Sequence, residues 1–374
     1  MKIVEVTDQK LLNQFIDFPY ILHKDHIGWL PPIYSDDKIF FSKKKNHSFQ
    51  GNHVKMFLAM NENQVLGRIM GVIPEKYNKR HGLKDARFCY IESIESIEIV
   101  HELLATVENW AKSFGCTQMV GPLGFSDKEP QGFELEGLDN PPLIMTNVNF
   151  PFMIDFMKLE GFEKKTDLVS FKIEVPEKYP EELYQKYLSY KHLHQNLKIL
   201  NFKTRFGVWR YLRPAVNLIN ELFVEIYAHT PMSKKDIDLL VKRFILLLSP
   251  QYMKGVLNEK KELVAFVIGF PDIVEGIQQC NGRLFPLGFW KILRSQQQSK
   301  ELILMIGGIK KEYRNMGLDY WLSLEYFEAI KKAGIKTVKS HLILEDNLKT
   351  HAKMTKFGGE INKRYRIFQR EIKI

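Results

Sequence analysis

The stretch LILMIGGIKKEYRNMGLD, residues 302–319, leads from an apolar segment through a short basic loop into a helix. Leu302–Ile309 has the apolar character and length of a buried strand, and helical spacing follows over Asp319–Ala333. The first turn of such a helix exposes unpaired N–H groups and the positive end of the helix dipole, which favour a phosphate. Arg314 adds a planar donor, and Gly317 lets the backbone approach a ligand without a Cβ. The sequence therefore predicts an anion site at this loop.

Around this segment, the two halves of the chain repeat one order of elements. In the first half, a helix over 97–113, Gly115, a strand from 118, a helix over 151–159, Gly161 and a strand over 168–173 follow one another. In the second half, a helix over 319–333, Gly334, a strand over 337–344, a helix over 348–356, Gly358 and a strand over 365–372 follow one another. Glycine after a helix is typical of a left-handed C-terminal cap. The repeat predicts two α/β domains, residues 1–175 and 176–374, with the boundary at the two prolines of Val175–Pro180.

The loop and the segment after it resemble the GNAT superfamily of acyl-CoA N-acyltransferases. The pyrophosphate loop of that family reads Arg/Gln-x-x-Gly-x-Gly/Ala, and Arg314-Asn315-Met316-Gly317-Leu318 is similar to it. Asn347 before a helix, and Lys356-Phe357-Gly358 at its end, resemble the family's Asn and its Lys-x-Gly-Phe ending. The stretches GRIMGVI, GPLGF, NPPLIM and LEGFEKK further resemble bacterial two-domain proteins described as GNAT-type acetyltransferases.

The resemblance implies a fold and an acyl donor. The implied fold is α/β (α+β), with tandem GNAT-like domains whose mixed, mostly antiparallel sheets are flanked by helices. The implied co-substrate is acetyl-CoA or another acyl-CoA, with no metal. Its expected binding residues are Gly307, Ile309, Arg314, Asn315, Met316, Gly317, Leu318 and Asn347. This expectation requires that the amides of residues 314–318 face open space, so packed side chains there would argue against it.

The chain departs from the family pattern at several positions. Asp319 stands where the family has a small residue; its carboxylate would repel a phosphate or cap the helix instead. In the first half, the acidic stretch Ile91–Ser96 replaces the loop, so no pyrophosphate is expected there. Many family members use a tyrosine as general acid, and Met354 and Met157 align with it here. Neither methionine can donate a proton.

Acyl transfer to an amine requires a group that removes a proton from that amine. Glu345 and Glu92 are the candidate bases, because each lies near the end of a predicted strand. Tyr313 and Tyr320 are candidate acids or substrate contacts. For all four side chains, an ion pair or ordinary packing is the alternative role.

The composition narrows the class of protein. The 374 residues carry 54 Lys and Arg against 44 Asp and Glu, a net charge of +10, which favours anionic partners. Cys89, Cys116 and Cys280 are few and far apart, as in a reducing compartment without disulfides. His23 and His26 lack the third ligand of a metal site. With no apolar run of about 18 residues and no secretory signal at the N-terminus, we expect a cytoplasmic protein.

The expected function is acyl-CoA-dependent N-acyl transfer to a small-molecule amine. A catalytically degenerate GNAT-fold binding or scaffold protein is the alternative that Asp319, Met354 and Met157 favour. A transferase using aminoacyl-tRNA, as in Fem-type peptidyl transferases, would need a long helical hairpin that the sequence does not predict, and nucleic acid is not favoured as a partner. The acceptor, the acyl length and the oligomeric state stay open.

Two further segments stand out by composition. Gly121–Pro142 is rich in Gly, Pro, Asp and Glu and is predicted to be a long loop that covers a cleft between the domains. Gln278–Gln298 is predicted to be irregular and basic. In and around it, cationic residues alternate with aromatic ones: Arg283, Phe285, Phe289, Trp290, Lys291, Arg294 and Lys300. Such a pattern suits nucleic acid or lipid phosphate, although packing as an amphipathic linker is the favoured role.

Overall fold

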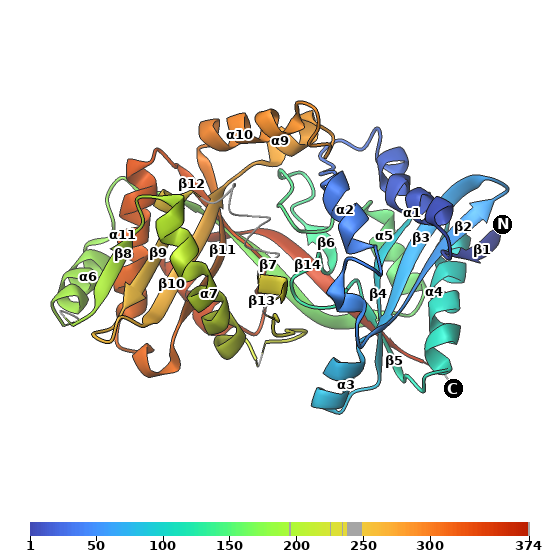
Figure 1. Cartoon of the computed structure of the whole chain (residues 1–374), viewed down its shortest axis with the longest axis horizontal. Coiled ribbons are helices and arrows are strands. Elements are labelled where there is room, and N and C mark those ends of the chain that lie inside the picture. Colours follow the sequence, from blue (N-terminus) through green and yellow to red (C-terminus); the bar gives the residue numbers. More distant parts are fainter. Residues whose placement is uncertain (194–195, 225, 234, 238–248, 373–374) are drawn as a thin grey trace.

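The computed structural model describes residues 1–193, 196–224, 226–233, 235–237 and 249–372 (Figure 1). The sequence also predicts a helix over Lys234–Leu248, which lies almost wholly outside these ranges. The first half contains β1 (Lys2–Glu5), α1 (Gln9–Leu22), α2 (Tyr34–Phe40), β2 (His53–Asn61), β3 (Gln64–Ile73), α3 (Glu75–His81), β4 (Asp85–Ser93), α4 (Ile97–Lys112), β5 (Gln118–Gly121), β6 (Phe133–Glu136), α5 (Phe152–Leu159) and β7 (Glu163–Glu174).

The second half has the same mixture of helices and strands. It contains α6 (Glu181–Leu193), β8 (Lys198–Asn201), α7 (Arg205–Leu222), β9 (Met253–Leu257), β10 (Leu263–Pro271), α9 (Val274–Gln279), α10 (Gly288–Gln298), β11 (Glu301–Ile309), α11 (Leu318–Lys332), β12 (Thr337–Ser340), β13 (Ile343–Leu344), α12 (Leu348–Lys356) and β14 (Glu360–Glu371). Gly115 and Gly334 follow α4 and α11 with φ of 70° and 84°, which confirms the predicted left-handed caps.

One mixed sheet runs through both halves. Its strand order is β1-β2-β3-β4-β5-β14-β7-β12-β11-β10-β9-β8, with β13 on β7 and β6 on β14. The pairs β4–β5 and β11–β12 are parallel, and the other pairs are antiparallel. In each half the parallel pair separates after a few residues, since β4 continues to Ser93 and β11 to Ile309. The predicted mixed, mostly antiparallel α/β fold is confirmed.

The last strand of each half pairs with the other half. β14, at the end of the chain, lies next to β5, where Phe368 faces Gly121. β7, at the end of the first half, lies next to β12, where Ile173 faces Val338. β7 and β14 also pair with each other along most of their length. The sheet is therefore continuous across the predicted boundary at residue 175, and each half is completed by a strand of the other.

Successive side chains of each strand point to opposite faces of the sheet, and helices cover both faces. In the first half, α4 packs on the face that carries Phe57, Ile69 and Phe88. α1 packs on the opposite face, which carries Leu58 and Met70. In the second half, α11 and α7 cover opposite faces in the same way. The helices appear on both sides of the strands in Figure 1.

The segment Gly121–Pro142 is mostly irregular, as its composition predicts, and only Gly121 and a short stretch in its middle belong to strands. It contains the short strand β6, which pairs with β14 through Phe133 and Arg366. Its first residues, Gly121–Ser126, are all buried. The first part of the segment is therefore in the core, and its role as a cover over a cleft stays a prediction.

Candidate functional site

The loop before α11 joins a strand to a helix, as the sequence predicts. Asn315 and Gly317 both have left-handed backbones, with φ of 59° and 76°. The N–H groups of Tyr320 and Trp321 donate to the Gly317 carbonyl, each at 3.1 Å, and so begin the helix. Arg314 Nε donates to the Ile309 carbonyl at 3.0 Å, which ties the guanidinium to the end of β11.

The face of Gly317 that a diphosphate would need is covered. A Cβ added to Gly317 would lie 2.1 Å from the ring of Tyr190, a residue of α6. That ring also stacks on Tyr320 with a centroid distance of 6.1 Å. Met316, the residue before Gly317, is 48% exposed. The Tyr190 ring therefore blocks access to Gly317 from the side where a Cβ would point.

Asp319 does not cap α11. The N-cap position belongs to Gly317, where no side chain forms a capping hydrogen bond. The Asp319 carboxylate instead lies 3.9 Å from Lys353 Nζ on α12. Burial lowers the pKa of Lys353, and the charge of Asp319 acts against that shift. The expected repulsion of a phosphate is therefore partly offset by a neighbouring ammonium group.

The structure brings some of the predicted residues together and separates others. Arg314, Asn315, Met316, Gly317 and Leu318 form one loop, and Gly307 and Ile309 lie at the end of the strand before it. Tyr313 packs beside this loop against the start of α11, where its hydroxyl lies 3.4 Å from Asn258 Nδ2.

Asn347 and Glu345 have local partners of their own. Asn347 Oδ1 accepts from the Thr350 N–H at 3.3 Å and so caps α12. Glu345 accepts from Lys164 Nζ at 2.6 Å and from the Asp167 N–H at 2.9 Å. Burial would raise the pKa of Glu345, but these hydrogen bonds outweigh it and lower that pKa. Both arrangements favour a structural role.

Glu92 lies in the other half, at the end of β4. Its carboxylate accepts from Arg68 Nε at 2.7 Å and lies 3.4 Å from His23 Nε2. Burial would raise the pKa of Glu92, but the Arg68 charge and the His23 hydrogen bond lower it to about 2. A carboxylate that holds its charge so firmly is a weak proton acceptor.

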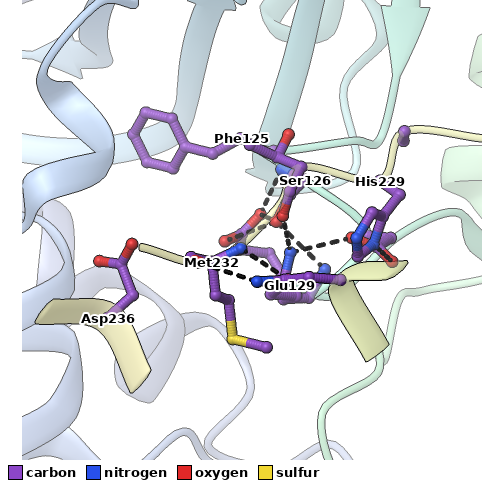
Figure 2. Close-up of polar contacts among 12 residues, drawn as sticks. Phe125, Ser126, Glu129, His229, Met232 and Asp236 are labelled. Atoms are coloured by element: carbon purple, nitrogen blue, oxygen red, sulfur yellow. Dashed lines mark hydrogen bonds and ion pairs between the residues drawn. The ribbon is translucent and has the colours of Figure 1, made fainter. Parts of the chain in front are cut away.

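A buried polar cluster that no motif indicates lies between the two halves (Figure 2). His229 comes from the segment after α7, and Asp127 and Glu129 come from the segment before β6. His229 Nδ1 lies 2.9 Å from Asp127 Oδ2, and the imidazole is 1% exposed. Its Nε2 is buried without a hydrogen-bond partner among the described residues. The hydrogen bond to Asp127 favours the tautomer in which Nε2 carries a free lone pair.

The backbone around the cluster is fixed by buried contacts. Ala228 has φ of 61°, and its N–H donates to the Tyr77 hydroxyl at 3.1 Å. The buried Arg87 donates to the carbonyls of Gly124 and Phe125 at 3.1 and 3.0 Å. Both contacts join elements that are far apart in the sequence. They hold Asp127 and His229 against each other.

The pKa values of the two carboxyl groups in the cluster are shifted in opposite directions. Burial would raise the pKa of Asp127, but the hydrogen bond from His229 and the charge of Lys128 lower it. Burial dominates at Glu129 and raises its pKa to about 7, although Glu129 accepts from the Ser126 N–H at 2.6 Å. Paired titratable groups with separated pKa values are typical of sites that move protons.

Replacing Glu129 with glutamine is expected to stabilise the protein at alkaline pH. The pKa of the Glu129 carboxyl rises from 4.5 to about 7 on folding. Between these two pH values, the folded protein therefore keeps a proton on Glu129 that the unfolded chain has lost. The stability of the native protein should therefore fall as the pH rises from about 4.5 to about 7. A pKa shift of this size changes the free energy of unfolding by at most about 3 kcal/mol, and the partial exposure of the side chain reduces this value.

Thermal melts of Glu129→Gln and the native protein measure the effect. The free energy of unfolding of the variant should exceed that of the native protein by about 1–3 kcal/mol at about pH 8, and by almost nothing near pH 4.5. Glu136→Gln, on the same segment but exposed, is the matched control and should show no such dependence. An equal gain at both pH values would show that Glu129 is ionised in the fold.

Part of this cluster could be found in the sequence. The unusual composition of Gly121–Pro142 marked the segment that carries Asp127 and Glu129. His229 stands 102 residues after Asp127 and matches no spacing motif, so no local signal pairs them. No group of three or more His, Cys, Asp or Glu side chains suited to a metal occurs among the described residues. In the same part of the chain, no helix combines the length and apolar character needed to cross a bilayer.

Comparison with known proteins agrees with this architecture. No family model matches the chain. Protein YghO of Escherichia coli K12 is 24% identical over 375 residues, covering 96% of this chain and 93% of that protein. The bacterial ceramide synthase of Caulobacter vibrioides is 21% identical over 384 residues, covering 100% and 98%.

Solved structures show the same fold at low sequence identity. A tandem GNAT protein from the clavulanic acid biosynthesis pathway is 12% identical, with a TM-score of 0.54 over 100% of this chain and 99% of that one. A GCN5-related glucosamine N-acetyltransferase region of a fungal β-N-acetylglucosaminidase is 9% identical, with a TM-score of 0.56 over 99% of this chain and 38% of that one. The loop before α11, the repeated parallel strand pairs and these likenesses together identify the chain as a two-domain protein of GNAT-like fold.

Proposed function

We propose that this protein transfers an acyl group from an acyl-CoA to a primary amine and so forms an amide. The observation that carries the proposal is the buried His229–Asp127 pair with its unoccupied Nε2. Burying a polar nitrogen without a partner costs free energy, so such an atom needs an explanation, and the one that we propose here is proton transfer. The GNAT-like fold supports acyl transfer as the reaction class.

The chemistry requires three proton transfers and one substitution at carbon. His229 Nε2 accepts a proton from the ammonium form of the acceptor, while Asp127 stabilises the imidazolium that forms. The amine then attacks the thioester carbonyl, forming a C–N bond. As the C–S bond breaks, the leaving thiolate takes the proton from His229. The second proton of the amine nitrogen passes to solvent.

The amine substrate that we favour is a long-chain base, and the favoured donor is a long-chain acyl-CoA. This choice rests on the relative from Caulobacter, which is called a ceramide synthase, because a ceramide is the amide of a fatty acid and a long-chain amino alcohol. The likeness extends over the whole of both chains, so the proposal does not depend on one shared segment.

The donor's diphosphate is proposed to bind at the loop before α11. Arg314, Lys353 and the first amides of α11 supply positive charge or donors there. Tyr190 covers Gly317 and must move aside when the diphosphate approaches on that face. The fraction of molecules with the ring displaced then limits the apparent affinity for the donor.

The test measures release of free thiol and formation of amide with the purified full chain. Sphinganine with palmitoyl-CoA, and sphinganine with acetyl-CoA, are the substrate pairs. We expect turnover with palmitoyl-CoA, and we expect Tyr190→Ala to lower the KM for the donor by about 3–10-fold. Tyr184→Ala, a more exposed tyrosine of the same helix, is the control and should leave KM unchanged.

The same assay decides between the enzyme and its alternative. Tyr190 over Gly317 and Asp319 in the first helical turn favour a degenerate protein that binds no donor. Absence of thiol release with either donor, together with no heat of acyl-CoA binding in titration calorimetry, would overturn the enzyme proposal. Unchanged KM in Tyr190→Ala would place the diphosphate elsewhere.

A further inference from the structure

An apolar surface stands out on the connection between β10 and β11. Phe285, Leu287 and Trp290 are 85%, 65% and 67% exposed. They lie at the turn between α9 and α10 and in the first turn of α10. In Figure 1 these two helices form a ridge along one edge of the molecule, outside the body of the sheet. Large apolar side chains gathered on a projecting edge are typical of a contact surface.

The ridge is held rigidly, so the exposure of these side chains is fixed by the fold. Gly276 of α9 packs against α10 so closely that a Cβ there would lie 2.8 Å from the Ile292 Cα. Val274, Ile277 and Ile292 are buried together on the inner side. This packing turns the opposite side of the hairpin outward. The segment predicted to be irregular is therefore an amphipathic helical hairpin.

The charged side chains of the turn and the second helix of the hairpin are all positive. Arg283, Lys291 and Arg294 are exposed beside them, with Lys300 at the end of the helix. No Asp or Glu occurs between Glu275 and Glu301. Lys291 Nζ donates to the Gln279 carbonyl at 2.9 Å. Within the described ranges, no Asp or Glu carboxylate forms an ion pair with Lys291 or Arg294. A partner for this surface must be apolar at its centre and anionic around it.

A neighbouring loop extends the apolar area. Ile27 is 96% exposed, and the carbonyl of Trp29, two residues later, accepts from Gln278 Nε2 at 3.0 Å. The Tyr34 N–H donates to the Gly282 carbonyl at 3.0 Å, so the segment after this loop is fixed to the turn between α9 and α10. The loop that carries Ile27 thus contacts the hairpin.

We propose that this ridge docks on the surface of a lipid bilayer that contains anionic phospholipids. Aromatic and aliphatic side chains enter the boundary between headgroups and acyl chains, while Lys and Arg bind lipid phosphates. A bilayer offers the required combination over a wide area. The inference does not depend on the acyltransferase proposal, although docking would bring the protein to any long-chain substrate held in the membrane.

The experiment is co-sedimentation of the full chain with vesicles. One set contains phosphatidylcholine alone, and the other contains about 30% phosphatidylglycerol. We expect at least tenfold stronger partition to the anionic vesicles, reduced at high salt because the lipid charge is screened. Phe285→Ser with Trp290→Ser should lower this partition at least tenfold, and Arg294→Gln should lower it to a smaller extent.

A matched control lies on another surface of the protein. Phe206 and Trp209 on α7 are 73% and 52% exposed, and their rings stack at 5.8 Å. Phe206→Ser with Trp209→Ser should leave partition unchanged, and circular dichroism checks that both double variants are folded. Equal partition to both vesicle types, or equal loss in both double variants, would overturn the proposal. So would a dimer that only Phe285→Ser with Trp290→Ser dissociates, with no vesicle binding by the native chain.

Discussion

Replacing His229 with alanine is expected to lower kcat for amide formation by about 10²–10⁴-fold, the usual contribution of a general base. The imidazole is the one group of the buried cluster that pairs with an ionised carboxylate and keeps a free nitrogen. Without it, the acceptor amine must lose its proton to water. The measurement is thiol release at saturating donor and amine, with the far-ultraviolet spectrum as a check on folding.

Two variants test whether the role of His229 is catalytic or purely structural. His229→Asn keeps an amide donor for Asp127 but has no basic nitrogen, so it should lose as much activity as the alanine variant and keep more stability. Asp127→Asn should lose less activity, because the imidazole remains but its tautomer is no longer fixed. If His229→Ala retains kcat within a few fold, His229 has only a packing role.

The local features of the fold could be predicted from the sequence, because they depend on neighbouring residues. The strand over the apolar run Leu302–Ile309, and the left-handed caps Gly115 and Gly334, occur as expected. Each depends on residues within a few positions of one another. The pairing of β7 and β14 with strands of the opposite half could not be predicted. Phe368 of β14 lies opposite Gly121 of β5, and the periodicity of a strand does not indicate which distant strand is its neighbour.

The candidate site shows the same division between local and distant effects. Charged residues at strand ends, such as Glu92 and Glu345, are visible in the sequence. Their ionic partners, Arg68 and Lys164, are distant in the sequence and decide that both carboxylates are paired. Likewise, the sequence predicts the loop at Gly317 but not the ring of Tyr190 that covers it. A sequence motif specifies the backbone of a site, whereas its accessibility depends on packing from other elements.

The last prediction concerns the buried ion pair between Lys363 and Glu134, which joins the segment before α5 to β14. The two side chains are 1% and 2% exposed. Lys363 Nζ also donates to the carbonyls of Gly137 and Asn140 at 2.7 and 3.1 Å. Lys363→Met should destabilise the protein by about 3–5 kcal/mol, because it leaves the Glu134 charge and two carbonyls without a partner.

Urea unfolding at two pH values tests the cause of this loss. Burial already raises the pKa of Glu134, and the charge and hydrogen bonds of Lys363 act against that shift. Without Lys363 that pKa should rise further, so the loss should be greater at about pH 8 than at about pH 5, where the carboxyl is protonated. Lys363→Met with Glu134→Leu should recover much of the stability, since no buried charge remains. A loss that is equal at both pH values and is not recovered in the double variant would mean that the packing of the Lys363 chain, and not its charge, holds β14 in the first half.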